Sequence, residues 1–290
     1  MTLQHIPVLV DKVIEYLNPK KNEKFIDATF GLGGYSEKIL ARLGSKGSVL
    51  GIDWDRKNIL EGQKRLEQFK NQLRIREGNF ADIEKIARSE KYVSVSGIVL
   101  DLGLASTQIT NPHYGLSFSG KKQVLDMRLD PEARFSAKDI INHYPEKKLA
   151  DVFYQNADLG NSRSIARKIV EAREKKEIIY NQELVNLLGS KNPKFLAPVF
   201  QALRIEVNKE LENLKKALPQ AVSILKNGGR IVVVSYHSGE DRIVKNFFRE
   251  QKHEGSLKIL TKKPIIAERE EIIINPRSRS AKLRAAEKIC

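Results

Sequence analysis

Cysteine is almost absent from this sequence: among 290 residues the only one is Cys290, the last. A disulfide framework and a Cys-x-x-Cys zinc site are therefore excluded, and a reducing, cytoplasmic location is the default expectation. The five histidines are scattered without the spacing of metal ligands, so no metal is expected. The sequence also lacks an apolar run of about 18 residues, the length needed to cross a bilayer, so no membrane partner is expected.

Acidic residues are fewer than basic residues. The chain carries 51 basic and 36 acidic residues, which gives a formal net charge of +15. An excess of this size favours a polyanionic partner, nucleic acid before an anionic membrane surface. The apolar content of 41% and the charged content of 30% are those of a globular protein with room for one large or two modest domains.

The most informative stretch runs from Phe25 to Ser36. A short apolar run ends at Asp27, and glycines follow at positions 31, 33 and 34, directly before an amphipathic segment. This pattern predicts a strand, a tight turn and a helix. Glycine suits such a turn because it accepts a positive φ and lets a ligand approach the backbone.

A second acid lies 20 residues after Gly33, since Asp53 closes the next apolar run. An acid at the tip of the second strand is where a Rossmann-like site holds a ribose. The dinucleotide pattern would place its third glycine at position 36, where this chain has Ser36. S-adenosylmethionine, which has a ribose but no pyrophosphate, is therefore favoured over NAD.

Three further strands are expected at 73–80, 96–103 and 230–235. They alternate with helical patterns up to residue 103, which predicts an α/β fold with a Rossmann-like, doubly wound parallel sheet. The last two strands are separated by about 130 residues, far more than a crossover needs. The gap shows only helical patterns, including a long run from 195 to 225 that Pro198 and Pro219 are expected to interrupt.

The long gap predicts two domains. We expect residues 1–107 and 207–290 to form the donor-binding domain and residues 108–206 to form an inserted helical subdomain. An insertion at the carboxyl edge of a sheet favours a role in substrate recognition. A helical cap that only stabilises the fold remains the alternative.

The C-terminal region begins with two apolar segments, 257–260 and 271–274, which are expected to form a closing hairpin. A cationic stretch follows, with four basic side chains within eight positions. We predict that these side chains bind RNA phosphates, although a frayed basic terminus is the alternative. They are Arg277, Arg279, Lys282 and Arg284.

Longer motifs follow in order along nearly the whole chain. They are His5-Ile-Pro-Val-Leu9, Asp27-Ala-Thr-Phe-Gly-Leu-Gly-Gly34, Leu100-Asp-Leu-Gly103, Leu125-Asp-Met-Arg128, Phe200-Gln-Ala-Leu-Arg-Ile205, His237-Ser238 with Glu240-Asp-Arg242, and Asn275 to Arg284. In these motifs the sequence resembles the RsmH (MraW) family. Members of this family are bacterial S-adenosylmethionine-dependent methyltransferases that modify N4 of a cytosine in the decoding centre of 16S ribosomal RNA.

The resemblance implies a class I S-adenosylmethionine-dependent methyltransferase fold and 16S ribosomal RNA in the small subunit as partner. A homodimer is left open. The resemblance also implies a set of donor-binding residues, of which the turn and the second strand independently indicated Gly33, Gly34 and Asp53. The implied set is Gly33, Gly34 and Tyr35 at the methyl donor, Asp53 at its ribose, Phe80 near the adenine, and Asp101 and Gln108 completing the site.

The sequence departs from the family pattern at four places. Tyr35 stands where the family usually has histidine, and Thr107 replaces a proline. Lys122-Gln-Val124 replaces Asp-Gly-Pro, and Gly239 replaces leucine. The changes at 107 and 122–124 affect the insertion and its approach, so they bear on substrate geometry rather than on donor binding.

Methyl transfer to N4 of cytosine is expected to need a group that accepts a proton from the amine, because the amine lone pair is delocalised into the ring. Asp101 at the tip of the fourth strand is the first candidate, and His237 after the fifth strand is the second. Asp101 could instead bind only the donor. His237 could instead make a structural hydrogen bond to its own turn.

Two other functions compete with this interpretation. The first is a methyltransferase of the same fold that acts on another RNA or on a protein. The second is a non-catalytic ribosome-assembly factor that binds RNA. The motifs argue against the first, and the intact glycines with Asp53 and Asp101 argue against the second.

Overall fold

The computed structural model describes residues 7–104, 108, 111–118, 122–130 and 133–290. The chain divides into two compact units, Met1–Gly103 with Leu211–Cys290 and Leu104–Glu210. We call them the sheet unit and the helical unit. The helical unit begins four residues before the predicted insertion, 108–206, and ends four residues after it.

The sheet unit contains one seven-stranded sheet in the order β3-β2-β1-β4-β5-β7-β6. The first five strands are parallel, and β7 runs antiparallel to both of its neighbours. The strands are β1 (Lys24–Asp27), β2 (Ser48–Asp53), β3 (Leu73–Glu77), β4 (Val95–Asp101), β5 (Leu225–Ser235), β6 (Leu257–Ile259) and β7 (Lys282–Lys288). The predicted parallel, doubly wound sheet is thus confirmed.

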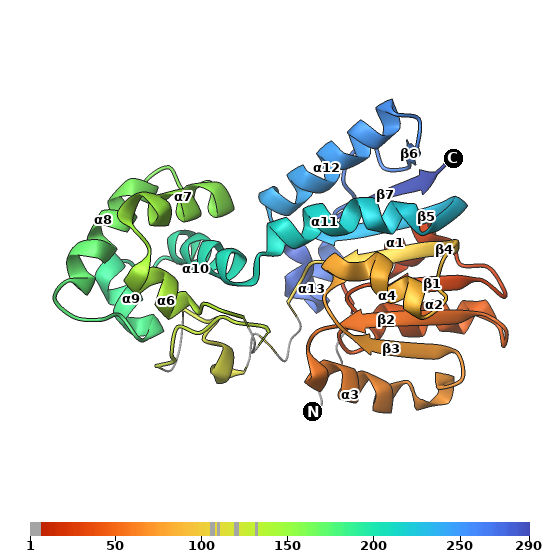
Figure 1. Cartoon of the computed structure of the whole chain (residues 1–290), viewed down its shortest axis with the longest axis horizontal. Coiled ribbons are helices and arrows are strands. Elements are labelled where there is room, and N and C mark those ends of the chain that lie inside the picture. Colours follow the sequence, from red (N-terminus) through yellow and green to blue (C-terminus); the bar gives the residue numbers. More distant parts are fainter. Residues whose placement is uncertain (1–6, 105–107, 109–110, 119–121, 131–132) are drawn as a thin grey trace. The chain divides into compact units, whose positions relative to one another are not determined.

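Helices cover both faces of this sheet (Figure 1). One face packs against α1 (Val10–Leu17) and α2 (Gly34–Leu43), and the other packs against α4 (Ile83–Ser89), α11 (Glu210–Ser223) and α12 (Ser238–His253). Burial on both faces explains why β4 is an almost continuous apolar run: Ile98 and Leu100 face one core and Val99 faces the other. The remaining helical segments are α3 (Arg56–Arg65), α13 (Arg269–Ile274), η1 (Glu67–Phe69), η2 (Phe80–Asp82) and η4 (Pro276–Ser280).

The predicted closing hairpin is wrong in its second strand. Residues 271–274 lie in α13, where Ile273 and Ile274 are 71% and 69% exposed. The partner of β6 is instead β7, which lies between β5 and β6. Its small buried side chains, Ala285 and Ala286, carry little of the apolar signal that reveals a strand.

In the part of the helical unit that the structure describes, five helices pack around an aliphatic and aromatic core. They are α6 (Ala137–His143), α7 (Glu146–Ala157), α8 (Ser162–Arg173), α9 (Asn181–Leu188) and α10 (Pro193–Asn208), and the short η3 (Pro112–Tyr114) precedes them. No helix in the described part of the chain has both the length and the apolarity required to cross a membrane.

The expected interruptions at Pro198 and Pro219 are wrong, since these prolines lie inside α10 and α11. The break falls between the two helices, at Lys209, whose φ is 53°. Each proline removes one backbone donor, which these well-packed helices tolerate, whereas a left-handed residue ends the helical path.

The motif from Leu125 to Arg128 has a structural role in the helical unit. Asn208 accepts a hydrogen bond from the Leu129 N–H (2.9 Å) and donates one to the Met127 carbonyl (2.8 Å). Met127 is fully buried with a φ of 61°. The buried amide of Asn208 therefore pairs with two backbone groups of this turn, which lies outside any helix or strand.

Candidate active site

Three carboxyl groups lie at the carboxyl ends of neighbouring parallel strands. Asp27, Asp53 and Asp101 are the last residues of β1, β2 and β4. Burial raises the pKa of Asp27 to about 7 and that of Asp53 to about 6, and it raises the pKa of Asp101 as well. This edge of an open α/β sheet is where ligands bind, and buried acids make it favourable for a cation.

The glycine turn meets two different requirements. Gly33 has a φ of 76° and precedes the first residue of α2, so an L side chain would be strained there. A Cβ on Gly34 would collide with the Pro7 ring. The space that Gly34 leaves is therefore filled by the chain's own Pro7, where the sequence had suggested a ligand.

Asp53 joins the glycine turn to the tip of β2. One of its oxygens accepts the Gly31 N–H (2.7 Å), and the other accepts the Asp55 N–H (2.8 Å). A backbone hydrogen bond from Trp54 also lowers the pKa of Asp53. A carboxylate has about four lone-pair sites, so capacity remains for the predicted contact with a ribose hydroxyl. Phe80 opens η2 just after β3 and packs partly buried against the core.

Asp101 is held from several sides. Its Oδ1 accepts the Gly103 N–H (3.0 Å), and its Oδ2 lies 2.9 Å from the Tyr35 hydroxyl of α2. Tyr236 is close too, because a Cβ on Gly103 would lie 2.6 Å from the Tyr236 ring and 3.1 Å from the Asp101 carboxyl. Hydrogen bonds from these groups lower the pKa of Asp101 and partly oppose the effect of burial.

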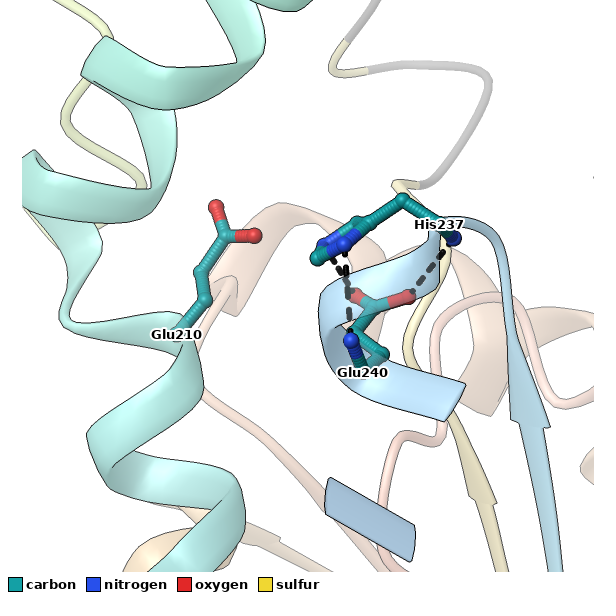
Figure 2. A group of neighbouring side chains, drawn as sticks. All are labelled: Glu210, His237 and Glu240. Atoms are coloured by element: carbon teal, nitrogen blue, oxygen red, sulfur yellow. Dashed lines mark hydrogen bonds and ion pairs between the residues drawn. The ribbon is translucent and has the colours of Figure 1, made fainter. Parts of the chain in front are cut away.

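His237 is the N-cap residue of α12. Its Nδ1 accepts the Glu240 N–H (3.4 Å), and the Glu240 carboxylate accepts the backbone N–H of His237 (Figure 2). The same carboxylate accepts the backbone N–H of Tyr236 (2.7 Å). A lone pair used at Nδ1 places the ring proton of the neutral imidazole on Nε2. Nε2 lies 3.1 Å from a Glu240 oxygen without the alignment of a hydrogen bond. The geometry thus favours the structural alternative for His237, a bond to its own turn.

Comparison with known proteins identifies the family. The model of the MraW methylase family matches residues 2–289. The chain belongs to this family. Relatives named ribosomal RNA small subunit methyltransferase H include a protein from Carboxydothermus hydrogenoformans, 41% identical over 100% of this chain and 99% of the relative. Another, from Caldicellulosiruptor saccharolyticus, is 40% identical over 99% of both chains.

The family confirms the predicted class I fold, the methyltransferase activity and S-adenosylmethionine as methyl donor. Among solved structures, one from Streptococcus mutans in complex with SAH covers 98% of this chain and 100% of its own. Its TM-score is 0.48 and its sequence identity is 14%, so the assignment rests on the family model and the sequence relatives.

The donor residues predicted for this MraW family member are divided between the units. Six of the seven lie in the sheet unit, at strand ends, in the glycine turn and the start of α2, or at the start of η2. The seventh, Gln108, belongs to the helical unit, where it is 4% exposed. The donor contacts of all seven stay predictions.

Two of the changes from the family pattern have visible surroundings. Lys122 lies over the Tyr180 ring, 3.7 Å from its centroid, and Val124 forms a bridge with Tyr180. A Cβ on Gly239 would lie 3.2 Å from the His237 ring, a tight contact for any larger residue. Thr107, together with His5 and Ile6 of the N-terminal motif, lies outside the described residues.

The four predicted RNA-binding cations differ in their surroundings. Arg284 is 7% exposed and forms a bidentate ion pair with Asp241 (2.6 and 3.1 Å). The Lys282 ammonium lies 4.0 Å from the same carboxylate. Arg279 is exposed and Arg277 is half-buried. Arg284 therefore supports the fold of β7, and a phosphate contact from it would require breaking a buried ion pair.

Sequence reasoning did not name Asp27 or Tyr236 among the site residues. Asp27 is fully buried and accepts the Ser36 hydroxyl (2.8 Å), while its other oxygen makes no hydrogen bond of ordinary geometry to any residue that the structure describes. An acid at the end of an apolar run was the available signal for Asp27. Tyr236 gave no such signal, because its position beside Gly103 depends on how β4 and β5 pair.

Proposed function

We propose that this chain methylates the N4 amine of a cytosine in the decoding centre of 16S ribosomal RNA, within the small subunit and in the cytoplasm. The name of its relatives, ribosomal RNA small subunit methyltransferase H, supports the substrate class. The observation that carries the chemistry is the Asp101 carboxyl, held in place at the tip of β4 beside the glycine turn. It is a proton acceptor at the edge where the donor binds.

The reaction is a displacement at the sulfonium methyl group. The cytosine amine attacks the methyl carbon, a C–N bond forms, and the C–S bond breaks. The Asp101 carboxylate accepts a hydrogen bond from the amine, which raises the nucleophilicity of the nitrogen, and then takes the proton that the methylated amine loses. Fixed positioning of the two reactants supplies much of the remaining rate enhancement.

The three acids at the strand ends also distinguish the donor from its product. S-adenosylmethionine carries a sulfonium charge that S-adenosylhomocysteine lacks. Asp27, Asp53 and Asp101 attract that charge, because burial, which raises the pKa of each, strengthens the attraction between a carboxylate and a nearby cation. Loss of the sulfonium charge on methyl transfer therefore weakens binding and favours product release.

RNA binding is assigned to the C-terminal segment, with Arg277 and Arg279 as its leading contacts and Lys282 in support. Guanidinium groups suit phosphates because they donate hydrogen bonds in pairs. The net charge of +15 adds a long-range attraction for RNA that falls with salt.

The test uses small subunits from a strain that lacks this activity, incubated with the purified protein and methyl-labelled donor. The RNA is then digested to nucleosides and separated by mass. We expect label in N4-methylcytosine at one decoding-centre position. Asp101→Asn is expected to lower the rate by about 10² to 10⁴, the usual contribution of a positioned proton acceptor.

The matched control is Asp11→Asn, which removes an exposed acid from α1 and should leave the rate unchanged. Label in another nucleoside would overturn the substrate while retaining the donor. No label with intact binding to the subunit would favour the assembly-factor alternative. An Asp101→Asn enzyme with the wild-type rate would remove the proposed proton acceptor.

A further inference from the structure

The Tyr35 hydroxyl lies between two hydrogen-bond acceptors. It is 2.6 Å from the Val8 carbonyl oxygen and 2.9 Å from Asp101 Oδ2. A phenol has one proton, and a carbonyl oxygen has none to give. Both short contacts can therefore be hydrogen bonds at the same time only when the Asp101 carboxyl is protonated and donates to Tyr35.

The alternative state has an ionised Asp101. The carboxylate then needs the Tyr35 proton, and the Val8 carbonyl loses its hydrogen bond to that hydroxyl. The ring need not move, because rotation about the C–O bond redirects the proton. Tyr35 is only 4% exposed, so its own protein neighbours surround the hydroxyl.

We propose that Tyr35 is a positioning residue that holds Asp101 in both protonation states, by donating to the carboxylate and by accepting from the carboxylic acid while donating to Val8. This inference rests on the proposed function, because it requires Asp101 to take a proton from the cytosine amine. Phenylalanine at this position could serve neither state.

The proton balance of the reaction follows this geometry. Before transfer, Asp101 is ionised and receives the Tyr35 proton in a hydrogen bond. As the C–N bond forms and the C–S bond breaks, one amine proton passes to the second lone pair of Asp101 Oδ2. The Tyr35 proton then turns to Val8, and rotation about the C–Oδ2 bond lets the new carboxylic acid donate to the Tyr35 oxygen. Deprotonation of Asp101 to solvent restores the first state.

Other titratable groups also face Asp101. Tyr236 comes from the end of β5, Glu240 from α12, Arg277 from η4 and Asp27 from β1. Burial is the main cause of the raised pKa of Asp101. The Tyr35 hydroxyl opposes it, because a bond to the charged form is stronger than a bond to the neutral form.

The test compares wild type and Tyr35→Phe in pH profiles of kcat, with the KM for S-adenosylmethionine measured at each pH. We expect kcat to fall about tenfold, which corresponds to one hydrogen bond lost in the transition state. The acid-side midpoint should move to higher pH, because the ionised carboxylate loses a donor. The KM for the donor and the binding of S-adenosylhomocysteine should stay within about twofold.

The matched control is Tyr92→Phe, which removes the hydroxyl of another buried tyrosine of the sheet unit and should leave the midpoint unchanged. A Tyr35→Phe profile that superimposes on wild type would overturn the inference. So would a raised KM with kcat unchanged, which would make Tyr35 a donor-binding residue only.

Failure of the proposed function gives a different result. The nucleoside labelled by wild type is identified first on the same RNA. Label outside N4-methylcytosine overturns the proposed function. It also overturns the inference, which requires the cytosine amine as proton donor. Label in N4-methylcytosine with an unshifted Tyr35→Phe profile overturns the inference alone.

Discussion

The two units differ in what they bury. Among the described residues, the buried polar side chains of the helical unit are all neutral amides and hydroxyls: Gln108, Ser136, Ser162, Asn181 and Asn208. The sheet unit also buries ionisable groups, namely Asp27, Asp55, Glu240 and Arg284. Amides and hydroxyls satisfy a fold at low cost, whereas buried charges are costly and mark chemistry or ion pairs. The proton chemistry that we propose therefore lies in the unit that already buries ionisable groups, some of which, such as Glu240 and Arg284, serve the fold.

The units differ in charge as well. The sheet unit has 34 basic and 23 acidic residues, a net charge of +11, and the helical unit has 17 and 13, a net charge of +4. Long-range attraction for RNA should thus come mainly from the sheet unit. The role of the helical unit in substrate recognition stays a prediction, and its composition favours shape over charge as the means.

Of the differences between the two units, the largest effect is expected from the buried acid Asp27 of the sheet unit. Its pKa is raised to about 7 in the folded protein, against about 3.9 in an unfolded chain. Between these values the folded protein holds a proton that the unfolded chain has lost. The free energy of unfolding should therefore fall as pH rises from 5 to 8, by about 2–3 kcal/mol at about 1.4 kcal/mol per unit.

Asp27→Asn should remove this pH dependence, which denaturant unfolding at pH 5, 6, 7 and 8 would measure. Asp11→Asn is the matched control, since Asp11 is an exposed acid of the same unit. If the free energy of unfolding falls equally with pH in wild type and in Asp27→Asn, ionisation of the buried Asp27 does not destabilise the sheet unit.

In the helical unit the corresponding change is Asn208→Ala. It leaves the Leu129 N–H and the Met127 carbonyl without their partner. We expect about 2 kcal/mol of local destabilisation, independent of pH because no ionisable group is removed. Hydrogen exchange of amides in residues 122–130 should speed up, while affinity for S-adenosylhomocysteine stays unchanged. A large loss of donor affinity would show that the units do not divide their work in this way.

Asp53→Asn should weaken donor binding about tenfold, the equivalent of roughly one hydrogen bond to an ionised group. Because the pKa of Asp53 is raised to about 6, wild-type affinity should fall as pH drops through 6. The variant should lack this dependence. Calorimetry with S-adenosylmethionine at pH 5 and pH 8 measures both effects, and equal affinities of wild type at the two pH values would count against Asp53 as a charged ribose ligand.

The smallest effect is expected at the exposed Arg279. Arg279→Ala should weaken RNA binding a few-fold and reduce the slope of log K against log salt by about 0.7–0.9, the value of one phosphate contact. The matched control on the helical unit is the exposed Lys191→Ala. A larger change in slope for Lys191→Ala than for Arg279→Ala would reverse the proposed division of charge.

Local sequence patterns were enough to predict site residues that lie within or directly after a single strand. The glycine turn and the acids at positions 53 and 101 follow directly from apolar runs that end in polar residues. Parallel pairing then brings the ends of β1, β2 and β4 to one edge. The motif from Leu125 to Arg128 was visible too, but only the Asn208 contacts show that it builds a turn.

The sequence by itself therefore determined the family, the parallel sheet, the donor and two of the acids at its edge. Tertiary structure decided the rest. It placed β7 beside β5 and paired Arg284 with Asp241. It also made His237 the cap of a helix and brought the Tyr35 hydroxyl to Asp101. The reason is physical. Periodicity along the chain encodes which face of an element is buried, whereas the partner of a polar side chain depends on residues brought close by packing.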